Sequence, residues 1–266
     1  MNIRKWLDLF STDLELKYNS EQTIQTYYSG VKKFLEFFSD FSEPKEIPNN
    51  EIKSWLLEAK TINTRKHRIF SIRAFYSMTV KMPKKVTSIP YPKKVKSQPM
   101  VIDQKVLINK ITSIENLKHR AIIQLAFSTG MRVSEILNLR IMDVDSDRMV
   151  IRVIEAKGKK DRIVRLTEST LEILRSYFLK YQPSVFLFNG HFGLKYSYTS
   201  CRKIVKKYLG DDVKFHSLRH ASLTAMIENG TDVSVVQKVA GHNSLSTTSG
   251  YLHICKRLID QVNAPI

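Results

Sequence analysis

Residues 81–102, KMPKKVTSIPYPKKVKSQPMVI, hold six lysines and four prolines and contain no acidic residue. Proline fixes φ and removes a backbone donor, so this composition predicts an extended segment that cannot form a helix. Such a segment joins folding units rather than crossing a core. Because 266 residues are enough for two modest cores, the sequence predicts two domains with a basic linker between them.

The part before the linker shows helical periodicity throughout. One apolar stripe recurs at intervals of three and four residues: Ile24, Tyr27, Tyr28, Val31, Phe34, Leu35 and Phe38. Asn19 or Ser20 can act as the N-cap of that helix. Similar patterns predict helices over 3–16, 50–59 and 64–80, so we expect a four-helix domain whose aromatic residues form the core.

The pattern becomes mixed after the linker. Helices are predicted over 117–127, ending near Gly130, and again from about Arg132. MVIRVIE (149–155) and RIVRL (162–166) predict two strands, and AKGKKD between them supplies the glycine and charges of a hairpin turn. Further helices are expected at 168–180, 197–208, 217–229 and 233–240, with Gly230 and Gly241 as the last two stops. The predicted fold class is mainly α with a small antiparallel β-sheet.

The charge of the chain narrows the class of partner. With 43 Lys and Arg against 25 Asp and Glu, the net charge is +18, far above the roughly +2 to +8 that solubility requires. A field of this size favours polyanions, and duplex nucleic acid is the largest class of polyanion in a cell. An extended basic linker would also suit a chain that follows a phosphate backbone around a duplex.

The sequence shows no membrane-spanning segment, no signal peptide and no cysteine motif. No run of about eighteen apolar residues could span a membrane, and the amino terminus lacks the unbroken apolar stretch of a signal peptide. Cys201 and Cys255 are too few and too isolated for a disulfide framework or a thiolate metal site. We therefore expect a cytoplasmic, nucleoid-associated protein in a reducing compartment, with no membrane contact.

Basic residues on the predicted helices and the linker are candidates for binding DNA phosphates. The helix over 64–80 carries several on its outward face, the linker carries more, and the helix over 197–208 adds a pair. The predicted set is Arg65, Lys66, Arg68, Arg73, Lys84, Lys85, Lys93, Lys94, Arg202 and Lys203.

Four stretches of the second domain form a set: TGMRVSEILNL (129–139), AKGKKDRIVRL (156–166), HSLRHASLTAMIENG (216–230) and GHNSLSTTSGY (241–251). Together and in this order they resemble the signature boxes of the tyrosine recombinases, most closely the Xer-like members of the phage integrase family. The resemblance implies a two-domain, C-shaped DNA clamp. It also implies a SAM-like core-binding domain over 1–82, a basic linker over 83–102 and a catalytic domain over 103–266.

The resemblance assigns six catalytic residues, which are Arg132, Lys157, His216, Arg219, His242 and Tyr251. In the transition state of phosphodiester cleavage, charge accumulates on the two non-bridging oxygens, and two arginines can hold those oxygens with forked donors. A phenol with a pKa of about 10 needs a base to become a good nucleophile. Tyr251 is then the nucleophile, His216 the base, and His242 a donor to the phosphate or a support for the tyrosine.

Lys157 is the residue that the resemblance assigns as the acid for the departing 5′ oxygen, because it precedes the turn glycine Gly158. Lys159 and Lys160 lie close enough to take the same role. Glu135, one turn after Arg132, is expected to orient an arginine, and His220 and His253 are expected to be structural. Ala156 stands where Xer-like proteins often have glycine, which should matter little. Gly250, directly before Tyr251, costs a helix roughly 1 kcal/mol relative to alanine and should therefore loosen this segment.

The expected function is site-specific DNA recombination through a 3′-phosphotyrosyl intermediate, in chromosome dimer resolution or in integration and excision of a mobile element. No cofactor and no metal are expected, because cations of the protein replace a metal. The expected partners are double-stranded DNA and three further copies in a homotetramer, with or without a second recombinase or an accessory protein. A short helix over 256–262 is expected to dock into a neighbouring protomer.

Two alternatives remain from the sequence. VSVVQKVAGHNSLSTTSGYL also resembles a helix-turn-helix, which would indicate a non-catalytic DNA-binding regulator. That interpretation leaves Arg132, His216 and Arg219 without a role. A type IB topoisomerase would keep the same active site but only cut and reseal one strand.

Overall fold

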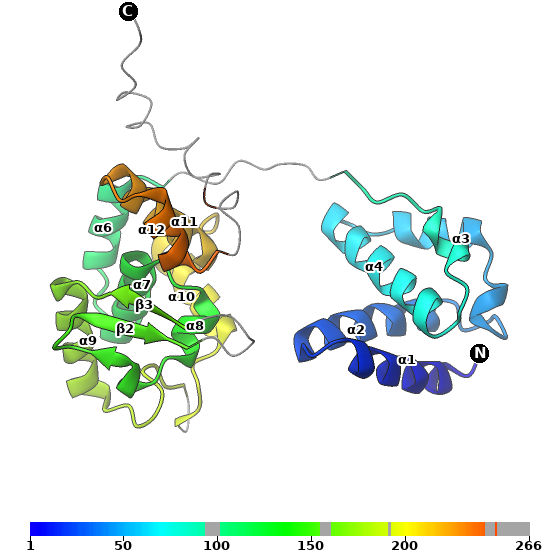
Figure 1. The fold of residues 1–266 in the computed structure, drawn as a ribbon, viewed down its shortest axis with the longest axis horizontal. Coiled ribbons are helices and arrows are strands. Elements are labelled where there is room, and N and C mark those ends of the chain that lie inside the picture. Colours follow the sequence, from blue (N-terminus) through cyan, green and yellow to red (C-terminus); the bar gives the residue numbers. More distant parts are fainter. Residues whose placement is uncertain (94–101, 155–160, 191–192, 243–247, 249–266) are drawn as a thin grey trace, which may run out of the picture. The chain divides into compact units, whose positions relative to one another are not determined.

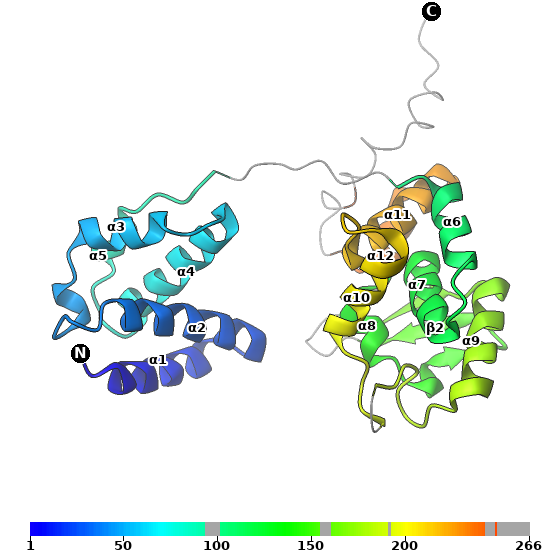
Figure 2. The same ribbon diagram turned by 180° about the vertical axis from the view of Figure 1, so that it is seen from behind.

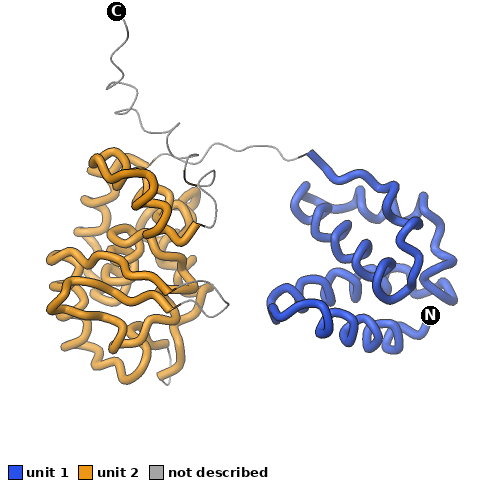
Figure 3. The backbone as a smooth tube through the Cα atoms, in the orientation of Figure 1, with its two compact units in different colours: residues 1–96 blue, residues 97–266 orange. Residues whose placement is uncertain are grey.

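The structure is a computed structural model that describes residues 1–93, 102–154, 161–190, 193–242 and Thr248. It forms two compact units, Met1–Lys96 and Ser97–Ile266 (Figure 3). The division between the units falls inside the basic segment 81–102. Within the described residues, no helix is both long enough and apolar enough to cross a membrane.

The first unit contains the four helices that the apolar stripes predict. They are α1 (Ile3–Lys17), α2 (Glu21–Phe37), α3 (Asn49–Leu57) and α4 (Ile62–Met78), with a 3₁₀ turn η1 (Pro44–Glu46) before α3 (Figure 1). Ser20 caps α2 by accepting the backbone N–H of Thr23. Phe34 lies fully buried with its ring edge-to-face against Trp55 and Tyr76, so the aromatic stripes form the core as predicted.

The prediction that residues 81–102 cannot contain a helix is wrong for their first part. A short helix α5 (Lys84–Thr87) follows Pro83, which occupies the N-cap position, where no intrahelical N–H is needed. Val86 and Ile89 are buried in the core of the first unit. Two apolar residues three positions apart thus pack this stretch against the helical unit, and the proline only sets where its helix begins.

The second unit is built around a central helix. Its helices are α6 (Gln104–Thr112), α7 (Leu117–Thr129), α8 (Val133–Asn138), α9 (Glu168–Tyr181), α10 (Tyr198–Leu209), α11 (Phe215–Glu228) and α12 (Val233–Ala240), with a 3₁₀ turn η2 (Ile141–Asp143). Helix α7 packs against α6, α8, α9, α10 and α11, as the two opposite views show (Figures 1 and 2). Its buried apolar side chains fill the centre of the main core.

A small antiparallel sheet lies beside these helices. Strands β1 (Val144–Asp145), β2 (Val150–Val153) and β3 (Arg162–Arg165) pair in that order, with Ile151 opposite Val164. The two longer strands are those predicted from the sequence. Mainly helical structure with a small antiparallel sheet is therefore confirmed for the described residues, while β1 and α6 were not predicted.

The ends of two helices in the second unit place catalytic candidates. Helix α12 ends at Gly241, whose φ of 61° lies in the left-handed region that favours glycine, as the sequence predicted. Helix α11 begins at Phe215, two residues before its predicted start. This earlier start puts His216 in the first turn of the helix, one turn before His220.

Candidate active site

Three arginine side chains converge on the carboxyl end of α12. Arg162 donates from Nε to the carbonyl of Val239 at 2.7 Å, Arg219 from Nη2 to that of Ala240 at 2.6 Å, and Arg132 from Nη2 to that of Gly241 at 3.0 Å. The last carbonyls of a helix have no intrahelical partner and carry the negative end of its dipole. Cationic donors therefore satisfy them, and the arginines of β3, α11 and the start of α8 meet at one turn.

Glu135 fixes two of these arginines. Its carboxylate accepts the Nη1 of Arg132 at 2.8 Å and, from Arg162, Nη1 at 3.0 Å and Nη2 at 2.7 Å. It also accepts the backbone N–H of Arg132 at 2.7 Å. Burial would raise the pKa of Glu135, but the hydrogen bonds and charges of Arg162 and Arg132 outweigh it and lower the pKa to about 2. The predicted role of Glu135, to orient an arginine, is confirmed.

The two arginines differ in exposure. The Arg132 side chain is 30% exposed, whereas those of Arg162 and Glu135 are only 9% and 8% exposed. Arg132 can therefore meet a ligand at the surface, while Arg162 and Glu135 support it from inside.

Arg219 lies deeper than either of these arginines. The whole residue is 2% exposed, and its Nη1 donates to the carbonyl of Gly130 at 2.7 Å. Gly130 ends α7 with a φ of 64°, and a Cβ there would lie 3.1 Å from Leu223 and from the hydroxyl of Ser222. The glycine that stops α7 thus lets α11 approach closely enough for Arg219 to reach the turn after α7.

His242 links Arg219 to the chain that follows α12. Its Nε2 lies 3.0 Å from Nη2 of Arg219, and its Nδ1 lies 2.9 Å from the hydroxyl of Thr248. Because arginine can only donate, Nε2 is the acceptor and the neutral ring carries its proton on Nδ1. Burial and the positive charges of Arg219 and Arg132 lower the pKa of His242 to about 4, so the ring is neutral at pH 7.

His216 and His220 lie one turn apart on α11. Their rings are in edge contact, with centroids 4.4 Å apart. Partial burial and the charges of Arg219 and Arg132 lower the pKa of His216, which leaves the ring able to accept a proton at neutral pH. Burial, with the neighbouring His216, lowers the pKa of His220 to about 4.

The structure thus brings together four of the six predicted catalytic residues, which are Arg132, His216, Arg219 and His242. Lys157 and Tyr251 lie outside the described residues, as do Lys159, Lys160, Lys94 and His253. Arg162 and Thr248 belong to the site but were not singled out from the sequence. Arg162 lies on a short strand next to the turn lysines. Its role in supporting Arg132 depends on its contact with Glu135, which is 27 positions away in the sequence.

Arg68 and Arg73, predicted on the outward face as candidates for binding phosphates, also make contacts within the first unit. Arg68 donates to the backbone carbonyl of Trp55 and covers its ring at 4.3 Å. Arg73 donates to the carbonyls of Thr87 and Ile89. The long side chains reach the backbone of neighbouring segments because their stems pack on apolar surface.

Lys85 is also engaged within the first unit. It donates to the carbonyl of Lys45, and burial lowers its pKa. The other predicted phosphate-binding residues described in this unit are half-buried or exposed; they are Arg65, Lys66, Lys84 and Lys93.

A basic hollow lies beside His216. It has a volume of about 480 Å³ and is lined from α10 by Arg202, Lys203 and Lys206, and from the start of α11 by Lys214 and His216. The predicted pair Arg202 and Lys203 thus lies next to a catalytic candidate. The lining also includes Asp211, whose carboxylate lies 3.2 Å from Nζ of Lys206, but an excess of positive charge remains, which suits a strand of phosphates.

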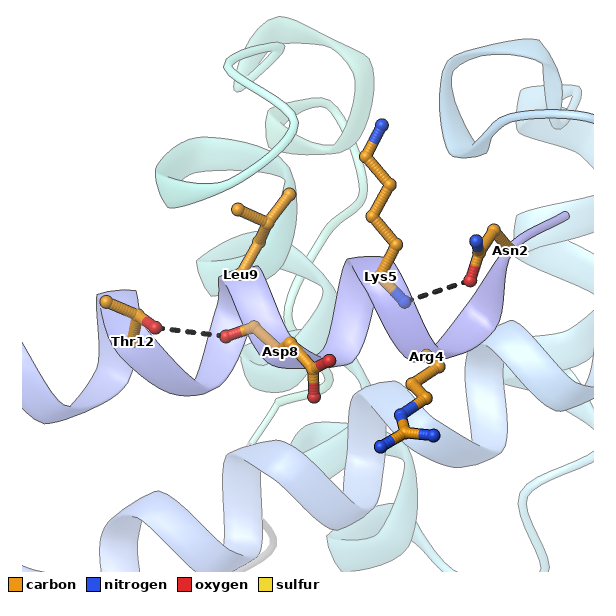
Figure 4. A pocket seen from close by; sticks show the side chains of 6 residues that line it. All are labelled: Asn2, Arg4, Lys5, Asp8, Leu9 and Thr12. Carbon is orange, nitrogen blue, oxygen red and sulfur yellow. Dashed lines mark hydrogen bonds between the residues drawn. The ribbon is translucent and has the colours of Figure 1, made fainter.

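Another hollow runs along α1 (Figure 4). Its visible polar contacts serve the helix itself, since Asn2 accepts the backbone N–H of Lys5 and Thr12 donates to the carbonyl of Asp8. Within the described residues, no group of three or more His, Cys, Asp or Glu side chains could hold a metal ion.

Comparison with known proteins gives the same family over both units. The profile of the "Phage integrase family" matches residues 101–257, and that of "Phage integrase, N-terminal SAM-like domain" matches residues 6–88. The tyrosine recombinase XerC of Corynebacterium glutamicum is 30% identical over 97% of this chain and 90% of its own length.

Solved structures agree with this comparison. A crystal structure of XerA recombinase is 26% identical, has a TM-score of 0.58 and covers all of both chains. A lambda integrase (75–356) dimer bound to a COC′ core site is 16% identical with a TM-score of 0.75, over 93% of this chain and 97% of the other. At that identity, the lambda integrase structure supports the fold.

Proposed function

Because the chain belongs to the phage integrase family, we propose that it is a site-specific DNA recombinase that cleaves and rejoins DNA strands through a 3′-phosphotyrosyl intermediate. The observation that carries the proposal is the convergence of Arg132, Arg219 and His242 on the turn that ends α12. Their chain order matches the recombinase boxes, and the first unit matches the SAM-like domain of the family.

The arginine cluster is suited to bind the scissile phosphate. Burial and, after it, the positive charges of Arg219 and Arg132 lower the pKa values of both His216 and His242, so the two guanidinium groups contribute a positive electrostatic field at the site. Such a field favours a phosphodiester and stabilises the extra charge of its transition state. Arg132, the more exposed of the two arginines, would hold one non-bridging oxygen, and Arg219 would hold or reinforce the other.

In the proposed cleavage step, the phosphoryl group is transferred from the 5′ oxygen of the DNA to Tyr251. The oxygen of Tyr251 forms a bond to phosphorus, and the bond from phosphorus to the 5′ oxygen breaks. His216, which is neutral at pH 7, takes the phenolic proton, and Lys157 gives a proton to the departing 5′ oxygen. The 3′-phosphotyrosyl bond retains the energy of the DNA backbone, so a 5′-hydroxyl from another strand can reverse the step and complete the exchange.

DNA binding is proposed to involve both units. The helical unit before the linker and the catalytic unit after it would clamp a duplex, with the basic residues between them following the phosphates. The exposed residues Lys84, Lys93, Arg202 and Lys203, together with Arg65 and Lys66, are the proposed contacts. Four strand cleavages are needed for one exchange, so a homotetramer on two sites is the proposed assembly in the nucleoid.

A nicked duplex that carries a recognition site tests the function directly. When cleavage releases a short fragment beyond the nick, rejoining is prevented and the covalent protein–DNA adduct accumulates. The wild-type protein should form this adduct, and Tyr251→Phe, which loses only the phenolic oxygen, should bind the same DNA without forming it. Two differently marked duplexes then separate recombination from topoisomerase activity, because relaxation without strand exchange would contradict the proposal.

A further inference from the structure

Thr248 is a fully buried residue whose hydroxyl faces the active site. It is 0% exposed, and its Oγ1 lies 2.9 Å from Nδ1 of His242. A buried hydroxyl is costly unless it is hydrogen-bonded, so this contact satisfies Thr248 as well as the ring. The contact joins two positions six residues apart.

The direction of this hydrogen bond is fixed by Arg219. The guanidinium of Arg219 donates to Nε2 of His242 at 3.0 Å, which leaves the proton of the neutral ring on Nδ1. Nδ1 therefore donates to the Thr248 hydroxyl. The three side chains form one polarised series in which the charge of Arg219 strengthens the second bond through the ring.

This series ties together parts of the site from different segments. Arg219 comes from the first half of α11, His242 directly follows α12, and Thr248 precedes Tyr251 by three residues. The hydroxyl of Thr248 thus acts on the histidine through a hydrogen bond.

We propose that Thr248 is a positioning residue of the recombinase, whose hydroxyl accepts the Nδ1–H of His242 and holds the ring in the orientation in which Nε2 meets Arg219. The proposal rests on the proposed function, because its consequence is faster covalent cleavage. DNA affinity should depend little on Thr248, since the residue is buried and does not contribute to the basic surface.

The test compares Thr248→Val with Thr248→Ser on the nicked duplex. Valine keeps the shape and branching of threonine but removes the hydroxyl, and serine keeps the hydroxyl. We expect Thr248→Val to form the covalent adduct about tenfold more slowly at saturating DNA, which is the effect of losing one hydrogen bond, with an unchanged Kd for duplex DNA. Thr248→Ser should stay within about twofold of the wild type. Equal rates for Thr248→Val and wild type, or equal losses in both variants, would overturn the proposal.

An NMR measurement on the DNA-free protein gives a second readout that needs no activity. Long-range ¹H–¹⁵N correlation of the histidine rings shows which nitrogen carries the proton, and a His242→Ala variant identifies the signal of His242. The proposal requires a protonated Nδ1 whose proton exchanges slowly in the wild type and in Thr248→Ser, and faster in Thr248→Val. A proton on Nε2 in the wild type refutes it even if Thr248→Val does not fold. If the wild-type protein forms no adduct while the ring is protonated on Nδ1, the proposed function fails and the hydrogen-bond geometry stands.

Discussion

Glu135→Gln tests the strength of the charge cluster that supports Arg132. The substitution keeps the size of the side chain but removes its negative charge and turns an amide NH₂ toward a guanidinium. The carboxylate accepts four hydrogen bonds, and its side chain is 8% exposed. The pKa of Glu135 falls from 4.5 to about 2 in the folded protein, and at about 1.4 kcal/mol per pKa unit this corresponds to about 3 kcal/mol of stability at pH 7.

The pH dependence of this stability has a definite sign. A lowered pKa means that the folded state binds the proton more weakly than the unfolded state, so the full contribution is present well above pH 4.5. It is lost as the pH falls toward 2, and at pH 3 about 1 kcal/mol remains. The wild type should therefore exceed Glu135→Gln by about 3 kcal/mol at pH 7 and by about 1 kcal/mol at pH 3.

Urea unfolding of the full chain can measure this difference in the second unit. Both tryptophans, Trp6 and Trp55, belong to the first unit, so their fluorescence reports that unit, whereas circular dichroism reports the helices of both. At pH 7 the second-unit transition of Glu135→Gln should move by about 1–2 M urea while the tryptophan transition stays in place. Glu172→Gln on the exposed face of α9 is the control and should change stability by less than about 0.5 kcal/mol. A Glu135→Gln protein as stable as this control, or a difference that does not shrink at pH 3, would refute the electrostatic explanation.

Three further predictions concern the active site and the DNA. Gly241→Ala should lower stability by about 1–2 kcal/mol and slow cleavage, because a Cβ there would lie 3.3 Å from the Arg162 guanidinium. The control Gly230→Ala introduces the same kind of backbone strain but has open space around its Cβ, so it should cleave DNA normally. Equal cleavage rates for the two variants would contradict this prediction. Lys157→Ala should slow cleavage at least about 100-fold on ordinary DNA and be rescued by sulfur in place of the bridging 5′ oxygen, since a thiolate needs no acid; rescue of Lys159→Ala instead would move the acid along the turn. Duplex affinity should fall steeply with salt, with a log–log slope of several units, and a flat dependence would exclude phosphate-dominated binding.

Much of the fold was predictable because its signals are local. The apolar stripes and the glycine stops specify their helices within a few residues, and α12 has the predicted bounds. The elements that were missed are short or lie next to the proline-rich segment. Helix α6 has Asp103 as its cap and buries Leu107 and Ile111, but it has only nine residues and follows the proline-rich segment, and β1 has two residues. The prediction that prolines exclude a helix from this segment failed at α5. Val86 and Ile89 are buried there, and the free energy gained by burying them favours the packed helix over an extended, exposed segment.

The catalytic candidates were predictable from residue types in a known order, but their partners were not. Glu135 lies three residues from Arg132, so its role could be inferred within one helical turn. Arg162 reaches Glu135 across 27 positions, and Arg73 reaches Ile89 across 16. A basic residue on a predicted surface looks the same whether it binds phosphate or a backbone carbonyl, because only the folded chain determines which acceptor lies within reach.

The carbonyls at the end of α12 also make the assembly of the arginine cluster depend on residues that are synthesised late. Arg132, Arg162 and Arg219 are made first, but their shared acceptors belong to Val239, Ala240 and Gly241. A ribosome-bound chain shorter than 241 residues can therefore fold much of its core, yet it lacks the groups that hold these arginines together. The arginine cluster is therefore completed only once the residues that end α12 have been added to the chain.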